Sequence, residues 1–430
     1  MSKKKLQVIT LGCSKNTVDT EHLLGMVGEK WEIVPEDADP RFTDCVLLNT
    51  CGFIGDAKEE SVNAILAAAQ RKSAGRVGRL MVFGCLSQRY MDQLPSLIPE
   101  VDEWFGARDL APVARALGVE PDGATVRYRT APAVPYAYLK ISEGCDRRCS
   151  YCAIPLIRGA HRSVPREILT KEAAMLAAQG VRELILIAQD TTWYGLDLYG
   201  RRALSDLLRD LCAVQGIEWI RIHYSYPSSF PEDVLDLMAV EPKICPYMDI
   251  PLQHIADPVL KAMRRNIDSA ATRSLIDKIR AKVPGIVLRT TMMVGHPGEG
   301  EKEFEELLDF VREARFERLG AFMYSEEEGT YGAEHFDDAV PQEEKQRRLD
   351  RLMELQREIS ASFNLSRVGT EELVLVDEVR DGYCICRSRY ESPDVDGEII
   401  VRTMDAPAPG SFVKVRITGA DDYDLTAELL

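Results

Sequence analysis

The sequence has no hydrophobic run long enough to cross a membrane, since such a span needs about 18 or more largely uncharged apolar residues. It also lacks a positive excess: 53 Lys and Arg stand against 69 Asp and Glu, for a formal net charge of −16. A protein whose main task is to grip a phosphate backbone would be basic. Three lysines and the apolar run Leu6–Leu11 open the chain, but Gln7 and Thr10 interrupt the run, which is too short for a secretion signal. We therefore expect a cytoplasmic protein with no membrane contact.

Cysteine is sparse, with eleven in 430 residues. That is too few for a disulfide scaffold, and the odd number argues against complete pairing. Three of the cysteines nevertheless lie within eight residues: Cys145, Cys149 and Cys152. Thiolates are soft ligands that suit a metal ion or an iron–sulfur cluster. Three ligands leave one coordination position open for a substrate or cofactor, which favours a chemical over a structural role.

The alternative is a structural zinc knuckle completed by a distant residue such as His161. Zinc sites usually show paired C-x2-C units, and only one such pair is present, so this interpretation is weaker. The CxxxCxxC spacing, with Tyr151 before the last Cys, resembles that of radical S-adenosylmethionine (SAM) enzymes, and Cys145, Cys149 and Cys152 are therefore called the SAM-loop cysteines below. The resemblance implies a 4Fe-4S cluster whose open iron chelates the amino and carboxylate groups of SAM.

Residues 1–130 contain three apolar runs, each of which ends just before a cysteine. These are Cys13, Cys51 and Cys85, here called the strand-end cysteines. Strand–helix alternation predicts an open parallel α/β sheet, in which ligands collect beyond the carboxyl ends of the strands. Each cysteine alone is typical of a small buried hydrophobe. Three at equivalent strand ends favour a shared cluster site, whereas Cys45, at the opposite end of its strand, is expected in the core.

Residues 136–340 continue the alternation for six rounds, which predicts an open (β/α)6 barrel with its site at the C-terminal face. The SAM-loop cysteines follow the first strand directly, as that geometry requires. Gln189 follows the second strand, and the turn with Gly295 and Glu299 follows the fifth. We expect these three residues and Tyr151 to contact the cofactor, although the turn equally fits an ordinary strand-to-helix connection. Asp190 fits a helix cap as well as a ligand.

A long helix is expected at 341–365, as a strut with an apolar stripe. Residues 366–430 alternate as short strands, which predicts a small antiparallel β-barrel of the oligonucleotide-binding type. The expected strands are Leu373–Val376, Tyr383–Cys386, Glu398–Val401 and Phe412–Ile417. This tail holds seven Lys and Arg and fourteen Asp and Glu, a formal charge of −7. A barrel that bound RNA would carry a basic stripe instead.

In its whole order the chain resembles the methylthiotransferases, which combine a three-Cys domain, a radical SAM barrel and a C-terminal TRAM domain. One class of that family modifies a tRNA adenosine, and the other an aspartate of a ribosomal protein. The tRNA class typically has Ser and Arg after the second strand-end cysteine and Gln-Asn-Val in place of residues 190–192, and neither is present. Four segments resemble the ribosomal-protein class: Asn49–Ile54, Gln189–Gly195, Pro251–His254 and Tyr324–Thr330.

By this resemblance the SAM-loop cysteines would hold the cluster that cleaves SAM, and the strand-end cysteines a second 4Fe-4S cluster that carries the sulfur. One SAM would methylate that sulfur, and another would yield the radical that removes hydrogen from the aspartate β-carbon. The resemblance implies small-subunit ribosomal protein number twelve as substrate, free or on the ribosome. It also implies a reductant protein such as flavodoxin or ferredoxin.

The residues alone leave two other functions open. A tRNA adenosine methylthiotransferase would have the same fold and clusters, but the acidic tail argues against a tRNA partner. An iron–sulfur scaffold or electron carrier would not need a six-unit barrel with an open-site loop. The acidic tail should instead steer a substrate rich in Lys and Arg, with Asp421, Asp422 and Asp424 among the charges that attract it.

Overall fold

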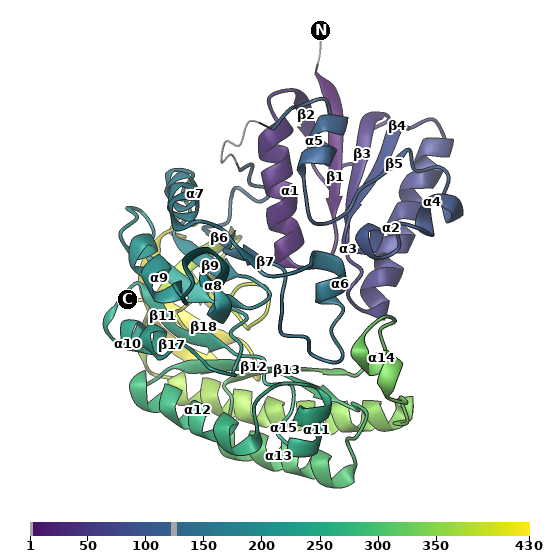
Figure 1. Cartoon of the computed structure of the whole chain (residues 1–430). Helices are drawn as coiled ribbons and strands as arrows, with labels where there is room; N and C mark the ends of the chain where they lie inside the picture. The colour runs from purple at the N-terminus through teal and green to yellow at the C-terminus, as the bar shows by residue number, and fades with distance from the viewer. Residues whose placement is uncertain (1–2, 122–126) are drawn as a thin grey trace.

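The computed structural model describes residues 3–121 and 127–430. It contains two parallel sheets and a small closed β-barrel, joined by helices (Figure 1). The amino-terminal sheet lies at one end of the molecule, and the long helix α15 lies at the other. Among the helices of the described residues, none has both the length and the apolar character that a membrane crossing demands.

The amino-terminal sheet has five parallel strands in the order β2-β1-β3-β4-β5. Apolar residues of α1 and α5 pack on one face, and those of α2, α3 and α4 on the other, which gives two separate cores. The predicted open parallel α/β sheet is confirmed. The strand bounds are β1 Lys4–Thr10, β2 Trp31–Val34, β3 Thr43–Thr50, β4 Val77–Gly84 and β5 Glu103–Trp104. The helix bounds are α1 Ser14–Val27, α2 Gly55–Ser73, α3 Cys85–Arg89, α4 Leu94–Leu97 and α5 Ala111–Ala116.

The direction in which strands are added reverses between β1 and β3, because β2 lies outside β1 whereas β4 lies outside β3. In open α/β sheets such a reversal opens a crevice at the carboxyl ends of the strands, and ligands bind there. Cys13 follows β1 and Cys51 follows β3, so two of the strand-end cysteines flank this crevice. Cys45 lies within β3 and is fully buried, in agreement with the expectation that it belongs to the core.

The central sheet has six strands in the order β13-β12-β11-β10-β9-β6. Its strands are parallel and follow chain order, and its two edges stay apart, so the predicted open barrel is confirmed. The strands are β6 Tyr136–Lys140, β9 Glu183–Ile187, β10 Trp219–Ile222, β11 Ile244–Asp249, β12 Val287–Val294 and β13 Arg318–Met323. The helices between them are α6 Ile154–Arg158, α7 Arg166–Ala178, η1 Thr191–Trp193, α8 Leu196–Tyr199, α9 Leu204–Cys212, α10 Glu232–Val240, α11 Asp257–Ala262, α12 Ser269–Lys282 and α13 Glu301–Ala314. The strands β7 Ser142–Glu143 and β8 Arg162–Ser163 pair as a two-stranded antiparallel sheet.

Alternate residues of the central strands serve two different purposes. One set, such as Leu184 and Leu186 of β9, forms the large core with the surrounding helices. The other set points to the open face of the sheet, where Ile185 and Ile187 pack against Val18 of α1. The amino-terminal unit therefore covers the open face next to the carboxyl ends of the strands.

The carboxyl-terminal tail covers the beginning of the same open face. The loop 388–398 between β15 and β16 reaches buried polar residues of the strands. Arg221 of β10 donates to the Arg389 carbonyl (3.0 Å), and the Tyr247 hydroxyl donates to Asp396 (2.7 Å). Both Arg221 and Tyr247 are fully buried. The tail therefore fills the N-terminal end of the open barrel and leaves the C-terminal end to the site.

The tail is a closed barrel in the order β14-β15-β16-β18-β17. Four of its strands were predicted, but β18 was not, and it pairs in parallel with β16. The barrel is thus antiparallel except for this one pair. Buried Cys384 and Cys386 belong to its core. The bounds are β14 Glu371–Arg380, β15 Tyr383–Arg387, β16 Ile399–Arg402, β17 Phe412–Ala420 and β18 Leu425–Leu429, and the preceding helices are α14 Tyr331–His335 and α15 Gln342–Arg367. The positions at which we divided the chain into domains stay a prediction.

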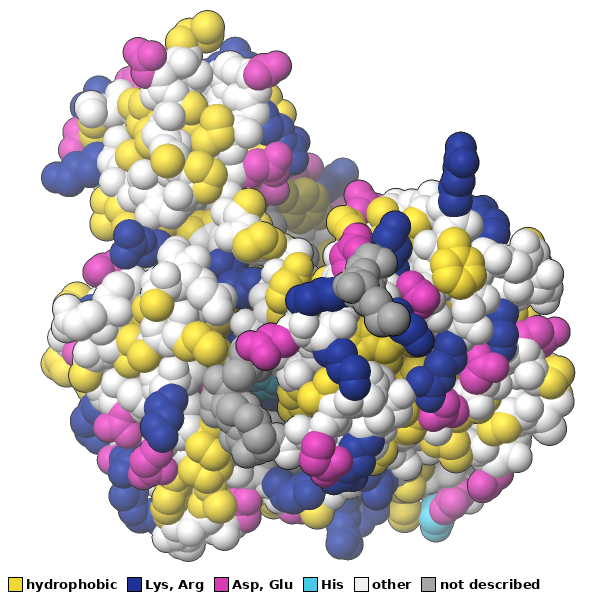
Figure 2. Space-filling view, turned by 90° about the horizontal axis from the view of Figure 1, so that it is seen from above, with side chains coloured by type: hydrophobic (Ala, Val, Ile, Leu, Met, Phe, Trp, Pro, Cys, Tyr) yellow, Lys and Arg dark blue, Asp and Glu magenta, His cyan; other side chains and the backbone are white. Residues whose placement is uncertain are grey.

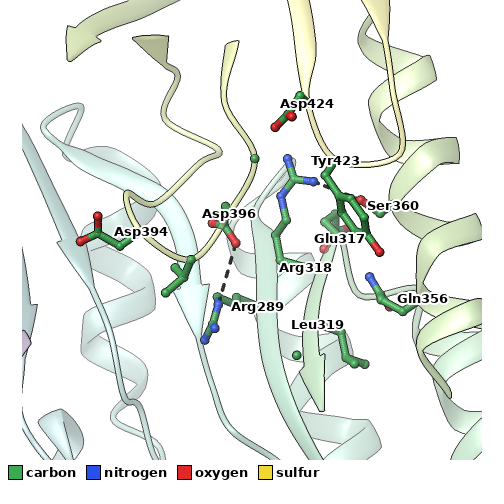
Figure 3. A pocket seen from close by; sticks show the side chains of 13 residues that line it. Arg289, Glu317, Arg318, Leu319, Gln356, Ser360, Asp394, Asp396, Tyr423 and Asp424 are labelled. Carbon is green, nitrogen blue, oxygen red and sulfur yellow. Dashed lines mark hydrogen bonds and ion pairs between the residues drawn. The ribbon is translucent and has the colours of Figure 1, made fainter. Parts of the chain in front are cut away.

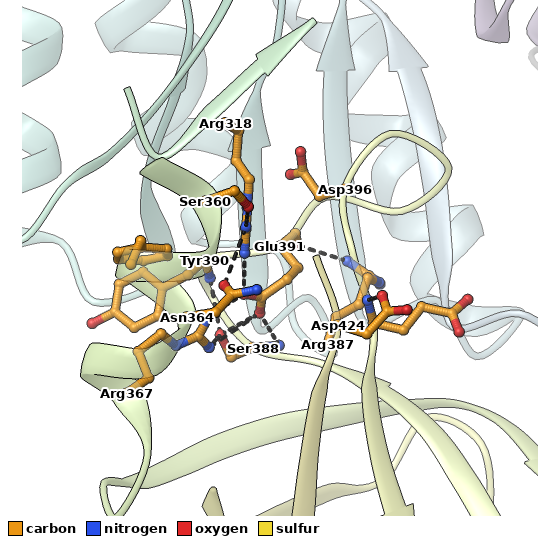
Figure 4. A network of polar contacts seen from close by, with 12 residues as sticks. Arg318, Ser360, Asn364, Arg367, Arg387, Ser388, Tyr390, Glu391, Asp396 and Asp424 are labelled. Carbon is orange, nitrogen blue, oxygen red and sulfur yellow. Dashed lines mark hydrogen bonds and ion pairs between the residues drawn. The ribbon is translucent and has the colours of Figure 1, made fainter. Parts of the chain in front are cut away.

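Glu391 joins the tail, α15 and the central sheet (Figure 4). It is buried and accepts hydrogen bonds from Arg318 of β13 (3.1 Å) and from Arg367 of α15. Ser388 donates to it through its hydroxyl (2.6 Å) and its backbone N–H (3.1 Å). Burial alone would raise the pKa of Glu391, but the two guanidinium groups and Ser388 lower it to about 2.

A polar cavity of about 370 Å³ lies beside this junction, between β12, β13, α15 and the tail (Figure 3). Arg289 and Arg318 line it together with Asp394, Asp396 and Asp424. Arg289 and Arg318 come from the first residues of their strands, so the cavity lies at the opposite end of the barrel from the SAM-loop cysteines.

Candidate active site

The structure brings the strand-end cysteines together at the carboxyl edge of the amino-terminal sheet. Neighbouring strands are in register there, with Thr10 opposite Asn49 and Thr50 opposite Gly84. Gly12, at φ +93°, allows the close approach, because a Cβ atom at this position would lie 2.7 Å from the Cβ and 3.0 Å from the Sγ of Cys51. The loop that carries Cys13 can therefore lie directly against Cys51.

Asn16, a buried residue of α1, ties these strand ends together. Its Nδ2 donates to the carbonyl of Leu11 (2.8 Å), which follows β1, and to that of Thr50 (3.3 Å), which ends β3. Its own carbonyl accepts from Asn49 (2.8 Å). Ser61 of α2 bonds both the N–H and the carbonyl of Cys51, at 3.0 and 2.9 Å. The thiols are thus positioned by hydrogen bonds that involve the backbone of their own loops.

The thiols of this group influence one another electrostatically. Burial raises the pKa of Cys85 to about 11; Arg158 opposes this increase, and the neighbouring Cys51 and Cys13 add to it. Burial likewise raises the pKa of Cys51, with Cys13 adding to the increase. Cys51 and Cys85 are therefore neutral thiols at pH 7, and a metal bound by them would have to displace their protons.

The SAM-loop cysteines lie between β7 and α6, just beyond β6. Gly144 has φ +79°, and a Cβ atom there would lie 2.1 Å from the Ala160 carbonyl, so only glycine lets the loop fold back on itself. Backbone bonds fix the loop, from Cys145 to the Gly159 carbonyl (3.0 Å) and from Cys152 to the Cys149 carbonyl (3.1 Å). These bonds hold Cys145, Cys149 and Cys152 on one compact loop.

Burial raises the pKa of Cys145 to about 12, and Cys149 adds to that increase. Burial also raises the pKa of Cys152, again with contributions from Cys149 and Cys145. Arg265 lies beside this group, although no motif in the sequence predicted this contact. The buried guanidinium is 3.5 Å from the Cys149 sulfur and 3.4 Å from the Tyr151 hydroxyl. A fixed positive charge thus accompanies the thiols.

Among the described residues, no group of three or more His, Cys, Asp or Glu side chains is arranged to hold a metal ion. The ligands of one zinc ion must all lie about 2.3 Å from the same atom, whereas each thiolate of a 4Fe-4S cluster binds a different iron. The Nε2 of His161, the distant residue considered for a zinc site, lies 3.1 Å from the Ser163 hydroxyl and 3.7 Å from Asp197, whereas its buried Nδ1 has no hydrogen-bond partner in the described part of the chain.

Gln189 is one of the predicted cofactor contacts, and one polar atom of its side chain is available to a ligand. Its Nε2 donates to Glu143 (2.6 Å), but its buried Oε1 has no hydrogen-bond partner in the described part of the chain. A buried acceptor without a partner is costly, so a ligand donor at this position would be stabilising. Asp190 instead caps η1, accepting from the Thr192 N–H (2.8 Å), and pairs with Arg147 (2.6 Å).

Two further residues have a buried polar atom without a partner in the described part of the chain, and the sequence analysis did not predict them. Ser225 and Gln253 follow β10 and β11 at the same edge of the sheet, and the buried Ser225 Oγ and Gln253 Oε1 lack partners among the residues described. With Gln189 they form a row of polar atoms along the carboxyl ends of three consecutive strands. Their position as polar residues just beyond predicted strands would have been the signal.

Glu299 was also predicted to contact the cofactor, but its carboxylate is already bound by other residues of the chain. Its Oε1 accepts from the Gly295 N–H (2.9 Å) and from Arg348 of α15 (2.7 Å), and its Oε2 is 3.1 Å from His254 Nε2. Burial alone would raise the pKa of Glu299, but these partners lower it below its ordinary value. The carboxylate therefore fixes the turn that begins at Gly295, and a direct contact of Glu299 with SAM stays a prediction. His254, to which we assigned no role, is its buried partner.

Tyr151 packs in a cluster with Met293 and Tyr324, close to His296. The Ser150 hydroxyl, which belongs to the SAM loop, lies 3.3 Å from the His296 ring nitrogen. The SAM loop and the turn after β12 are thus joined by one set of contacts. Tyr151 stays a predicted cofactor contact.

Comparison with known families agrees with this geometry. Residues 139–311 match the radical SAM superfamily, residues 5–106 the uncharacterized protein family UPF0004, and residues 368–430 the TRAM domain. A parallel six-stranded open barrel with three thiols on the loop after its first strand defines a radical SAM enzyme.

Curated relatives specify the family. The ribosomal protein uS12 methylthiotransferases RimO of Porphyromonas gingivalis and Parabacteroides distasonis are each 49% identical, with all of both chains covered. That of Flavobacterium johnsoniae is 48% identical and covers all of this chain and 98% of its own. The chain therefore belongs to the RimO family of methylthiotransferases, as its segments predicted.

Solved structures support the fold. The radical SAM methyltransferase TsrM from Kitasatospora setae, with cobalamin and a 4Fe-4S cluster bound, has a TM-score of 0.53 at 14% identity, covering 75% of this chain and 72% of its own. The cobalamin-dependent enzyme OxsB, with aqua-cobalamin and SAM bound, has a TM-score of 0.53 at 12% identity, covering 81% and 56%. At these identities the likeness concerns the fold alone.

Proposed function

We propose that this chain transfers a methylthio group to the β-carbon of an aspartate in ribosomal protein uS12. In this proposal the SAM-loop cysteines hold one 4Fe-4S cluster, the strand-end cysteines hold a second, and SAM is the other cofactor. The observation that carries it is the presence of two separate groups of three thiols at the carboxyl edges of two parallel sheets. Each group offers three thiolates, which leaves one iron of each cluster open to a ligand.

The contributions of this chain are positioning and exclusion of water. When bound, SAM and the clusters supply the radical and sulfur chemistry. Gln189, Ser225 and Gln253 offer buried polar atoms that would orient SAM beside the SAM-loop cysteines. Glu299 holds the turn at Gly295, whose backbone would border the cofactor.

The choice of uS12 rests on the relatives, whose names state that substrate across their full length. Charge supports it, because a chain of formal charge −16 attracts a basic ribosomal protein. On the face shown in Figure 2, Lys and Arg are interspersed with Asp and Glu, rather than gathered in the stripe that tRNA binding favours. An enzyme that reacts with a ribosomal protein would work in the cytoplasm, where a flavodoxin or ferredoxin would supply electrons.

The test separates the two clusters. Anaerobic reconstitution should give about eight irons per chain, from two four-iron clusters. Replacing the three SAM-loop cysteines by Ala should halve the iron and abolish cleavage of SAM. Replacing the three strand-end cysteines should also halve the iron but leave 5′-deoxyadenosine formation intact, with no methylthiolated product.

Full product formation by a folded variant without the strand-end cysteines would contradict the second cluster. Cleavage of SAM without the SAM-loop cysteines would contradict the first. The substrate is tested by offering purified uS12 and unmodified tRNA to the same reconstituted enzyme. Methylthiolation of tRNA alone would favour the tRNA adenosine methylthiotransferase.

A further inference from the structure

Arg158 of the central barrel contacts one of the strand-end cysteines, Cys85. This arginine is the last residue of α6, which directly follows the SAM loop and lies against the amino-terminal sheet (Figure 1). The residue is only 2% exposed. Its Nε donates to the Cys85 sulfur over 3.3 Å, and its Nη2 donates to Asn16 Oδ1 over 2.6 Å.

The remaining donors of Arg158 bind acceptors on both sides of the interface. Nη1 lies 2.7 Å from Asp19 of α1 and 3.1 Å from both Glu143 and the Ala107 carbonyl. Lys140 also pairs with Asp19 and Glu143. Two cations therefore balance two carboxylates, and the Cys85 thiol is the group that receives the Nε–H of the guanidinium.

The same network continues to the SAM loop. Glu143, which accepts from Arg158, also accepts from the Gly144 N–H (3.3 Å) and from Gln189 (2.6 Å). Gly144 opens the SAM loop, and Gln189 is a predicted cofactor contact. One chain of hydrogen bonds thus runs from Cys85 through Arg158 and Glu143 to the other site.

We propose that Arg158 is a positioning residue that raises the reduction potential of the cluster held by the strand-end cysteines. This inference rests on the proposed function, because it takes those cysteines to hold a cluster. Hydrogen bonds to the ligating sulfurs and nearby positive charge stabilise the more negative, reduced form of an iron–sulfur cluster. Arg158 supplies both at Cys85, from a domain that also carries the SAM loop.

The experiment uses the full chain with Cys145, Cys149 and Cys152 replaced by Ala, so that the second cluster alone gives a signal. Its midpoint potential is measured by an anaerobic redox titration followed by electron paramagnetic resonance. Arg158→Gln removes the charge and should shift the potential to more negative values. Arg158→Lys keeps the charge without the planar fork and should shift it less.

Arg108→Gln is the matched control. Arg108 reaches α6 from the amino-terminal unit, donating to the carbonyls of Ile157 (3.0 Å) and Leu156 (2.7 Å), and has no bond to a thiol. Both substitutions remove hydrogen bonds across the same interface, so a shift that came only from loosening it should also appear in Arg108→Gln, to a smaller extent because Arg108 is exposed. An unchanged potential in Arg158→Gln, or an equal shift in Arg108→Gln, would overturn the proposal.

Iron content separates this inference from the proposed function. If the triple-Ala background binds no iron, the second cluster itself is wrong. If the background binds iron but Arg158→Gln does not, Arg158→Lys is measured instead. Loss of iron from both Arg158 variants, with Arg108→Gln loaded, would make Arg158 an anchor of the site and overturn its role in setting the potential.

Discussion

Glu327 connects the two halves of the site, and its removal should separate them. Its carboxylate is 3% exposed and pairs with Lys58 of α2 (2.8 Å) and with Arg89 of α3 (2.7 Å). Glu327 follows β13 of the central barrel, while both cations belong to the amino-terminal unit. Arg89 also donates to the carbonyls of Gly52 (3.1 Å) and Glu328 (2.9 Å). The carboxylate thus fixes the loop of Cys51 against the barrel.

The expected magnitude follows from what Glu327→Gln leaves behind. Removing one partner of a buried ion pair costs about 3–5 kcal/mol. Arg89 keeps its two carbonyl acceptors and Lys58 is 24% exposed, so the lower end, about 3 kcal/mol, applies. Since about 1.4 kcal/mol is a factor of ten, the interface should open roughly a hundred times more often.

Hydrogen exchange measured by mass spectrometry is the assay, with peptides covering residues 52–58 and 325–330. Exchange there should rise roughly a hundredfold in Glu327→Gln, whereas the rest of the central sheet should be unaffected. Uncoupled formation of 5′-deoxyadenosine should increase relative to methylthiolated product, because the two groups of thiols lie on opposite sides of this contact. Glu334→Gln on neighbouring α14 is the control, since Glu334 is exposed. Equal protection in the variant and the parent chain would refute the reasoning.

Three further predictions concern the junction, the tail and the turn after β12. The pKa of Glu391 in the folded protein is about 2, against an ordinary value of 4.5. The ionised carboxylate therefore contributes its full stabilisation above pH 4.5, and this contribution is lost as the pH falls towards 2. Glu391→Gln should therefore cost about 3 kcal/mol at pH 7 and flatten the acid dependence, as followed by hydrogen exchange of the tail; an unchanged acid profile would contradict this. Replacing Asp421, Asp422 and Asp424 by Lys should slow association with uS12 about tenfold at low salt and have little effect at high salt. The association rate is measured by biolayer interferometry, and a change that does not depend on salt would argue against electrostatic steering. Glu299→Gln should raise the KM for SAM at unchanged iron content, and a loss of iron with unchanged KM would disprove a role in shaping the cofactor turn.

Local sequence signals predicted much of the architecture. Apolar runs that end just before Cys13, Cys51 and Cys85 were sufficient to place these residues at one sheet edge, because parallel strands run in the same direction and their carboxyl ends lie at the same edge. The strand β18, Leu425–Leu429, was missed since its sequence LTAEL has little of the β-branched and aromatic character typical of strands. Its place is set by pairing with β16 and β17 instead.

The partners of the site residues could not be predicted in the same way. Glu299 looked free because Arg348, which binds it, lies 49 residues further along the chain, on a helix with no sequence link to the turn. Arg158 reaches Cys85 across 73 residues and two sheets. Such contacts depend on how the sheets and helices pack against one another, and neither periodicity nor spacing carries that information.

The loop 388–398 has a consequence for recombination between relatives. It supplies the hydrogen-bond partners of polar groups inside the barrel: Arg221, Tyr247 and also His223, whose ring lies 2.8 Å from a serine hydroxyl of this loop. Burial lowers the pKa of His223 to about 4, so the ring is neutral and depends on that partner. A chimera that received a foreign tail would bury these groups unsatisfied, at about 1–3 kcal/mol each. The tail and the barrel lining must therefore be inherited as one unit, although family boundaries mark them as separate modules.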